Sequence, residues 1–170
     1  MIMPDWNVIV TTQRRDIREA FKQLRPHGEF KRSAFRGILT GKVENKEEFM
    51  DRMKEVKFPA FFRIIPIDAV FLFEPDKLTD RLKEMMPKYA EKIPEGESWD
   101  IAFERRGLKG AINSMEITNI LREQVKNLTK GRLDFEKPEN IIVIETLGKE
   151  CGVGFLSKEM KEKYHFVRAD

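Results

Sequence analysis

The apolar segment Ile141–Leu147 constrains the fold of this chain more than any other feature. Such a run predicts a strand that is buried on both faces of its sheet. The glycine-rich segment Gly148–Gly154 then turns the chain into a last short strand, and Ser98–Arg106 predicts an earlier strand that is followed by a helix. The last third of the chain therefore predicts a compact β-α-β-β unit with basic residues at its turns.

The first 67 residues predict a separate unit with the element order β-α-β-β-α-β. That order is typical of the split βαβ, or ferredoxin-like, arrangement. Apolar residues at helical spacing mark the first helix, and Asn45 with Glu48 three residues later forms a capping box for the second. The other elements predicted for this unit are the helix Gln13–Arg25 and four strands, Trp6–Thr12, Glu29–Phe35, Ile38–Val43 and Phe61–Pro66.

A second unit is predicted from Asp68 onward. Its first helix contains Pro87, which is expected to kink the helix or split it in two. Asn113, with Glu116 at the capping-box position, begins the next helix. The predicted buried stripe of that helix is Ile117, Ile120, Leu121, Val125 and Leu128. The chain is thus predicted to be an α/β (α+β) protein, with a ferredoxin-like domain at residues 1–67 and a second α/β domain at residues 68–170.

Composition narrows the class of protein without naming a function. Charged residues make up 36% of the chain, above the average of about 25% for soluble domains, and the net charge is +3. This surface is typical of a thermophile protein, and it allows a nucleic-acid partner. The lone Cys151 excludes an intramolecular disulfide and a thiolate zinc site. We expect a cytoplasmic protein without a membrane span, because no signal peptide and no apolar run of ~20 residues is evident.

The sequence shows no catalytic motif. It has no G-x-S-x-G elbow, and Gly148–Gly154 lacks both the Lys-Ser/Thr ending of a Walker loop and the following helix of a dinucleotide site. We expect Cys151 to be a small buried residue, and the alternative is a nucleophile with His27 or His165 brought close in space. No catalytic residue, cofactor or metal site is therefore predicted.

Basic residues instead cluster in three places, and each cluster taken alone is also compatible with a solvated face. One stripe follows the first helix, a second lies on the first hairpin, and a third lies at the turn after Ser98–Arg106. Guanidinium groups suit phosphate oxygens, and structured RNA is held mainly through its backbone and shape. The predicted RNA-binding residues in these clusters are Arg14, Arg18, Lys22, Lys31, Arg32, Arg36, Arg105, Arg106 and Lys109, and Lys149 and Lys158, which flank the last hairpin, are added to them.

The second unit resembles a THUMP domain. The resemblance rests on Ile64–Ile67, the paired helical region, Trp99–Arg106, the helix after it and Lys137–Glu145. Within that superfamily, Glu145–Gly154 is similar to the Cys-Gly hairpin of the stand-alone adaptors that support tRNA cytidine acetylation. The first unit resembles the ferredoxin-like domain that commonly precedes THUMP, although the longer basic flanks of the eukaryotic adaptors are missing here.

The resemblance implies a function. THUMP modules bind tRNA, often at the acceptor stem and 3′ end, and are usually fused to a modifying enzyme, whereas this chain ends where such a domain would begin. The resemblance therefore implies a non-catalytic protein that presents tRNA to a separate N-acetyltransferase making N4-acetylcytidine. The alternatives are a module serving a methyltransferase or thiouridine synthase, a cryptic Cys151 enzyme, or a protein–protein scaffold using Phe58–Phe73.

Overall fold

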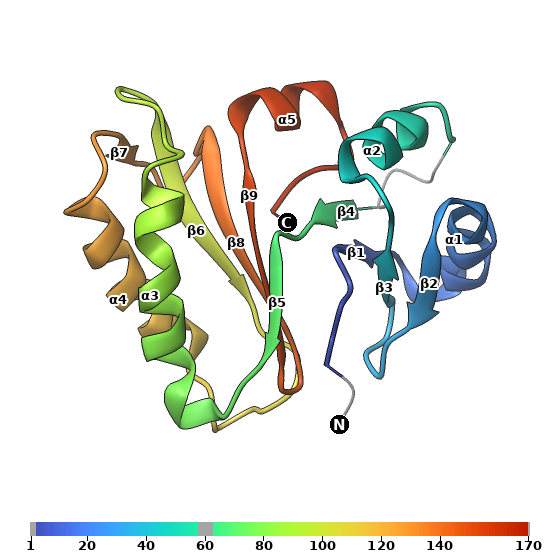
Figure 1. The fold of residues 1–170 in the computed structure, drawn as a ribbon, viewed down its shortest axis with the longest axis horizontal. Coiled ribbons are helices and arrows are strands. Elements are labelled where there is room, and N and C mark those ends of the chain that lie inside the picture. Colours follow the sequence, from blue (N-terminus) through green and yellow to red (C-terminus); the bar gives the residue numbers. More distant parts are fainter. Residues whose placement is uncertain (1–2, 58–62, 170) are drawn as a thin grey trace.

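The computed structural model describes residues 3–57 and 63–169, which form two sheets with helices around them (Figure 1). The first unit contains β1 (Val8–Thr11), β2 (Glu29–Arg32), β3 (Ile38–Lys42) and β4 (Arg63–Pro66), with helices α1 (Ile17–Leu24) and α2 (Lys46–Lys54). One 3-10 turn precedes α1, at Arg14–Asp16, and another follows it, at Arg25–His27.

The first sheet has the strand order β2-β3-β1-β4, and each described pair is antiparallel. The strands β1 and β2 consequently run in the same direction with β3 between them. The strands β3 and β4 are related in the same way around β1. This is the split βαβ topology, so the predicted ferredoxin-like arrangement is confirmed. Phe61 and Phe62, which were predicted to begin the fourth strand, lie outside the described residues.

The second sheet has the order β5-β9-β8-β6-β7. Its strands are β5 (Ala69–Leu72), β6 (Ser98–Glu104), β7 (Arg132–Leu133), β8 (Asn140–Leu147) and β9 (Glu150–Leu156). Its helices are α3 (Leu78–Ala90), which follows a 3-10 turn at Pro75–Lys77, α4 (Ser114–Lys126) and α5 (Lys158–Lys163). β8 pairs in parallel with β6 and antiparallel with β9.

The strand β8 is buried along its whole length, as its sequence predicted. Ile142 and Ile144 pack in the core shared with α3 and α4, which stand on one side of the second sheet (Figure 1). Ile141, Val143 and Leu147 point the other way and pack in the core of the first unit. One strand therefore separates the two cores and contributes to both.

The glycines of β9 allow the first unit to approach closely. A Cβ added at Gly152 would lie 2.5 Å from Trp6 Cη2, and one added at Gly154 would lie 2.6 Å from the Pro66 carbonyl oxygen. Trp6 is 4% exposed, and its Nε1 donates to Glu150 Oε1 at 2.8 Å. The glycine-rich segment thus forms part of a β-hairpin, as predicted. Because Gly152 and Gly154 have no side chain, Trp6 and Pro66 can pack directly against the backbone of β9.

The C-terminal segment returns to the first unit after α5. The Ile64 amide donates to the Phe166 carbonyl oxygen at 3.0 Å, and Tyr164 Oη donates to Asp51 Oδ1 at 2.6 Å. Phe166 and Val167 are buried in the core of the first unit. The strands of the first sheet thus all precede residue 68 and those of the second sheet all follow it. The C-terminal segment nevertheless packs in the core of the first unit.

Both helices begin at the asparagine that was predicted to cap them. Asn45 Oδ1 accepts from the Glu48 amide at 2.9 Å, and Asn113 Oδ1 accepts from the Glu116 amide at 3.0 Å. Each side chain satisfies an amide that has no partner within its helix.

Two details of the helices of the second unit differ from the prediction. Pro87 does not split α3, which continues through it to Ala90 because the proline lies in the last turn. The carbonyl oxygen of Lys83, four residues earlier, instead accepts from Gln124 Nε2 at 2.8 Å. Ile120 and Leu128, predicted to be buried, are 39% and 52% exposed. Leu128 lies beyond the end of α4 at Lys126, and α3 and the sheet cover only the face of α4 that holds Ile117, Leu121 and Val125.

No helix within the described ranges is long and apolar enough to span a membrane.

Candidate nucleic-acid interface

Arg14, Arg18 and Lys22 lie on the exposed side of the first helical segment. The opposite side buries Ala20 and Leu24 against the first sheet. None of the three cations forms an ion pair with a carboxylate in the described part of the chain. Their positive charge therefore faces solvent without a neutralising partner.

The β2–β3 hairpin presents a second group of cations, Lys31 and Arg32 in β2 and Arg36 in the loop after it, and all three are exposed. These also lack ion pairs among the residues that the structure covers. Ser33 closes the loop, because its Oγ accepts from the Phe35 amide at 3.0 Å and donates to the Ile38 carbonyl oxygen at 2.8 Å. Gly37 adopts φ +73°, a conformation that favours glycine. The loop thus holds Arg36 on an ordered turn.

The turn after β6 holds the third group, whose members differ in their surroundings. Lys109 is exposed, and the half-buried Arg105 donates from Nη1 to the Gly107 carbonyl oxygen at 2.6 Å. Arg106 donates from Nη1 to Glu145 Oε2 at 2.7 Å, and its side chain is only 15% exposed. Arg106 therefore has a structural partner that its sequence context did not predict.

The helix α4 begins further along the chain than Lys109. It starts at Ser114, after four further residues, and the Asn113 side chain already caps it. The intervening turn is left-handed at Gly107, Leu108 and Gly110.

Packing brings the second and third groups together. A Cβ added at Gly107 would lie 3.0 Å from Phe35 Cζ and 3.3 Å from Gly148 Cα, and the Gly148 amide donates to the Arg106 carbonyl oxygen at 2.8 Å. The β2–β3 loop, the turn after β6 and the β8–β9 turn thus meet at one end of the molecule, the lower end in Figure 1.

The beginning of the first helical segment lies at the same end. The Thr12 amide donates to the Gly37 carbonyl oxygen at 2.9 Å, which places Arg14 next to the β2–β3 loop. Lys149 lies in the β8–β9 turn, where it is exposed and 3.6 Å from Glu74 Oε2. We call this surface the basic end and define it by Arg14, Arg32, Arg36, Arg105, Lys109 and Lys149.

Lys158 lies elsewhere. It follows β9, whereas Lys149 precedes it, so the seven residues of that strand separate the two lysines. Lys158 Nζ is 3.3 Å from Glu139 Oε2, and this carboxylate raises the pKa of the lysine. The structure consequently does not bring Lys158 into the basic end.

Sequence reasoning missed one arrangement, a buried carboxylate between two guanidinium groups. Glu145 Oε1 accepts from Arg63 Nη2 at 2.7 Å while its Oε2 accepts from Arg106. The side chains of Glu145 and Arg63 are 1% and 6% exposed. The available signal was one carboxylate within an apolar strand, because a buried charge requires a partner.

The alternative of a nucleophilic cysteine finds no support in the geometry. Cys151 is fully buried in the core of the second unit, and burial raises the pKa of its thiol to about 12. A reactive cysteine needs a lowered pKa and access to solvent. No group of three or more histidine, cysteine or acidic side chains in the described ranges could hold a metal ion.

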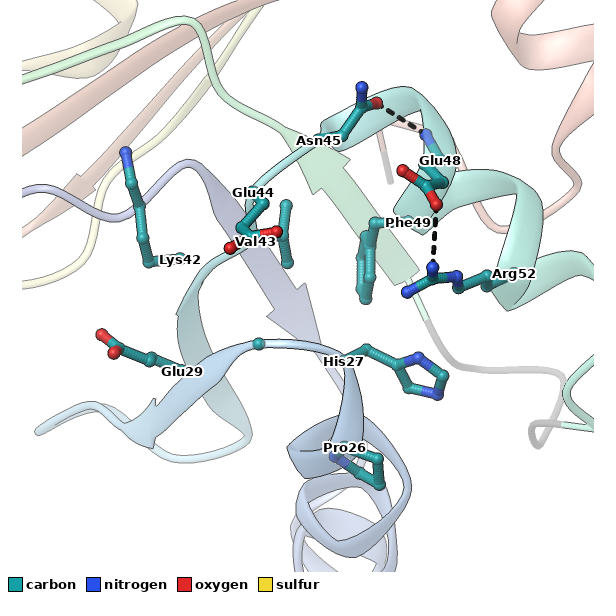
Figure 2. A pocket seen from close by; sticks show the side chains of 11 residues that line it. Pro26, His27, Glu29, Lys42, Val43, Glu44, Asn45, Glu48, Phe49 and Arg52 are labelled. Carbon is teal, nitrogen blue, oxygen red and sulfur yellow. Dashed lines mark hydrogen bonds and ion pairs between the residues drawn. The ribbon is translucent and has the colours of Figure 1, made fainter.

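A hollow of about 490 Å³ lies between the start of β2 and α2, at the opposite end of the β2–β3 hairpin from Arg36 (Figure 2). Figure 2 shows the His27 ring beside Phe49, and the two ring centroids are 6.4 Å apart. Glu48 is engaged by Asn45 through its amide and by Arg52 through its carboxylate. The hollow combines mixed charges with one half-buried histidine, and it lies apart from the basic end.

Comparison with curated proteins gives one distant relative. No protein-family model matches the chain. The chain is 24% identical over 130 residues to the uncharacterized protein MJ0421 of Methanocaldococcus jannaschii. The match covers 76% of this chain and 34% of that protein, so the chain spans about a third of its relative.

Solved structures share the fold across both units. PH1313 from Pyrococcus horikoshii gives a TM-score of 0.63 at 18% identity, over 89% of this chain and 54% of that one. A 4-thiouridine synthetase in complex with RNA and bound ATP has a TM-score of 0.60 at 14% identity, over 89% of this chain and 41% of that one. The predicted fold is confirmed. TrmN from Thermus thermophilus shares the fold as well, with a TM-score of 0.59 at 14% identity over 87% of this chain and 44% of that one.

Proposed function

We propose that this chain is a non-catalytic tRNA-binding protein that presents tRNA to a separate modifying enzyme. The observation that carries the proposal is the contact of Phe35 with Gly107, because it joins cations of both units into one basic end. Unpaired guanidinium and ammonium groups on ordered turns suit the regularly spaced phosphates of a folded RNA. The fold neighbour solved with RNA, a 4-thiouridine synthetase, supports the same partner.

We propose an N-acetyltransferase that makes N4-acetylcytidine as the enzyme served. This part of the proposal rests on the likeness of Glu145–Gly154 to the hairpin of the acetylation adaptors. In this chain the hairpin is a packing element, since Cys151 fills the core and Gly152 receives Trp6. The acetyltransferase would supply the acetyl-CoA and ATP sites.

The second candidate is a tRNA-binding module for another modification, thiolation or methylation. Two observations support it. The fold neighbours include a 4-thiouridine synthetase, and this chain covers only 41–54% of the length of the solved neighbours. A larger enzyme could hold an equivalent module within one chain. The two candidates share the tRNA-binding surface and differ in the nucleoside produced.

Binding of total tRNA at increasing salt tests the shared part. Replacing Arg14, Arg36 and Lys109 with glutamine should weaken binding to all tRNA species. It should also make the slope of log K against log salt shallower by roughly two to three, because each phosphate contact contributes about 0.7–0.9 to that slope. The matched control neutralises Lys83, Lys126 and Lys130, which are also exposed and unpaired among the described residues but lie on α3 and around the end of α4. Equal losses in both triple variants would contradict the proposed surface.

Nucleoside analysis by mass spectrometry tests the enzyme partner. tRNA incubated with an acetyltransferase, acetyl-CoA and ATP should contain N4-acetylcytidine only when this chain is added. The Arg14, Arg36 and Lys109 variant should fail in the same reaction. Unchanged acetylation in cells that lack the chain, together with lost 4-thiouridine or methylated nucleosides, would favour the second candidate.

A further inference from the structure

The ion pairs of Glu145 connect the two units directly. Arg63 belongs to β4 in the first sheet, whereas Glu145 and Arg106 belong to the second unit. Each carboxylate oxygen of Glu145 accepts from a different guanidinium group at 2.7 Å. Such bonds are directional, so they fix the separation and the relative orientation of the strands that carry them.

Arg63 also holds two other segments in place. Its Nε donates to the Arg168 carbonyl oxygen at 2.6 Å, and its Nη2 donates to the Ala169 carbonyl oxygen at 3.1 Å. Its Nη1 lies 3.4 Å from Thr11 Oγ1, at the end of β1. Glu145 in β8 therefore holds Arg63 of β4, and Arg63 in turn contacts β1 and the C-terminal segment. We call the place where these four segments meet the junction.

This junction lies next to the basic end. Arg106 immediately precedes Gly107, the residue against which Phe35 packs. Thr11 precedes Thr12, whose amide is bonded to the β2–β3 loop. A rotation of the first unit about the junction would separate Arg36 and Arg14 from Arg105 and Lys109.

We propose that Glu145 is a positioning residue for RNA binding, because by holding Arg63 and Arg106 it aligns the basic segments of the two units. This inference rests on the proposed tRNA-binding function. It concerns alignment alone, since Glu145 is buried and does not reach RNA.

The direction in which Glu145→Gln changes RNA binding distinguishes a positioning role of Glu145 from a purely electrostatic one. Glu145→Gln removes one negative charge and releases Arg106, so charge alone would strengthen RNA binding. Misalignment predicts the opposite, since fewer phosphates can be contacted at the same time. General destabilisation would lower the active fraction of protein without changing the salt slope of the molecules that bind.

The experiment compares Glu145→Gln with a matched control, Asp100→Asn. The Asp100 carboxylate accepts from Arg122 Nε at 2.7 Å and from Arg122 Nη2 at 3.0 Å, so this substitution disrupts a part-buried ion pair within the second unit only. A second test variant, Phe35→Ala, weakens the other contact between the basic segments and removes no charge. It keeps the test available if Glu145→Gln does not fold.

Two measurements are made on each variant. The first is the salt dependence of total tRNA binding. The second is the distance distribution between nitroxide labels on Glu19→Cys in α1 and Glu123→Cys in α4, both exposed and on opposite sides of the molecule (Figure 1). We expect Cys151 not to take up label, because it is buried.

We expect Glu145→Gln to broaden the distance distribution and to make the salt slope shallower by about one to two, with Phe35→Ala shifting it in the same direction. Asp100→Asn should change neither measurement. A wild-type slope or tighter binding in Glu145→Gln would overturn the inference, as would an unchanged distance distribution. If the wild-type protein shows no salt-dependent tRNA binding, the proposed function fails, and the distance measurement still decides whether Glu145 aligns the units.

Discussion

Replacing Gly152 with alanine tests whether β9 needs its glycines in order to receive the first unit. The added Cβ would lie 2.5 Å from Trp6 Cη2, 2.7 Å from Trp6 Cζ3 and 3.1 Å from Ile67 Cγ2. Favourable carbon–carbon separations are about 3.5–4.0 Å, so the indole ring must move by roughly 1 Å. The ring is bonded through Nε1 to Glu150, and movement strains or breaks that bond.

The expected cost can be worked out from three contributions. Overpacking a tight contact costs about 2 kcal/mol, and loss of the indole hydrogen bond adds about 1 kcal/mol. Alanine is favoured over glycine within a strand by about 0.5–1 kcal/mol, which offsets part of this. Gly152→Ala should therefore lower the free energy of unfolding by about 2 kcal/mol, or the melting temperature by about 4–8 °C for a chain of this size.

Urea unfolding followed by circular dichroism measures this change, and a double-mutant cycle with Trp6→Phe identifies its cause. A phenylalanine ring does not reach the positions of Cη2 and Cζ3, so it relieves the clash. The double variant should be more stable than the sum of the two single changes predicts, by about 1 kcal/mol or more. A change below about 0.5 kcal/mol in Gly152→Ala, or strict additivity, would refute the close-packing explanation.

Three further substitutions or treatments have defined outcomes. Maleimide should alkylate Cys151 in the native protein roughly a thousandfold more slowly than in urea, because burial raises its thiol pKa to about 12; rapid native labelling detected by mass spectrometry would contradict this. Tyr164→Phe should raise the pKa of Asp51, which the Tyr164 hydroxyl and Lys163 hold below its ordinary value. Since a lowered carboxyl pKa stabilises the folded state above about pH 4, the stability lost in Tyr164→Phe should be largest at neutral pH and disappear in acid, as pH-dependent unfolding can measure. Asn113→Ala should lower the free energy of unfolding by about 1 kcal/mol through loss of the bond to the Glu116 amide, whereas Asn113→Ser should retain most of it.

Features that depend on local sequence were predictable. The Asn45 and Asn113 caps need only a side chain and an amide three residues apart, so the sequence alone identifies them. The burial of β8 follows from its apolar run in the same way. Ile120 shows where this reasoning stops, because helical spacing marks an apolar face without revealing how wide the covering layer is.

The candidate site was predictable in part for a related reason. Exposed cations on turns, such as Arg36 and Lys109, can be recognised from the residues around them. Whether a given arginine is free depends on partners that are distant in sequence, and Arg106 meets Glu145 across 39 positions. The convergence of the β2–β3 loop with the turn after β6 likewise depends on the packing of two units, which no local pattern encodes.

Two kinds of contact join the units, and they contribute differently to the proposed function. The packing of Trp6 on Gly152 excludes water and stabilises the junction, but the hydrophobic effect has no directional requirement of its own. The bonds from Glu145 to Arg63 and Arg106 are directional, and a buried ionic group of this kind is no more stable than well-packed apolar residues of similar volume. Stability alone therefore gives no reason for a carboxylate among the residues of β8 that face the first unit. Orientation does give one, because a surface that contacts several phosphates of one RNA requires the cations of both units to keep a fixed spacing.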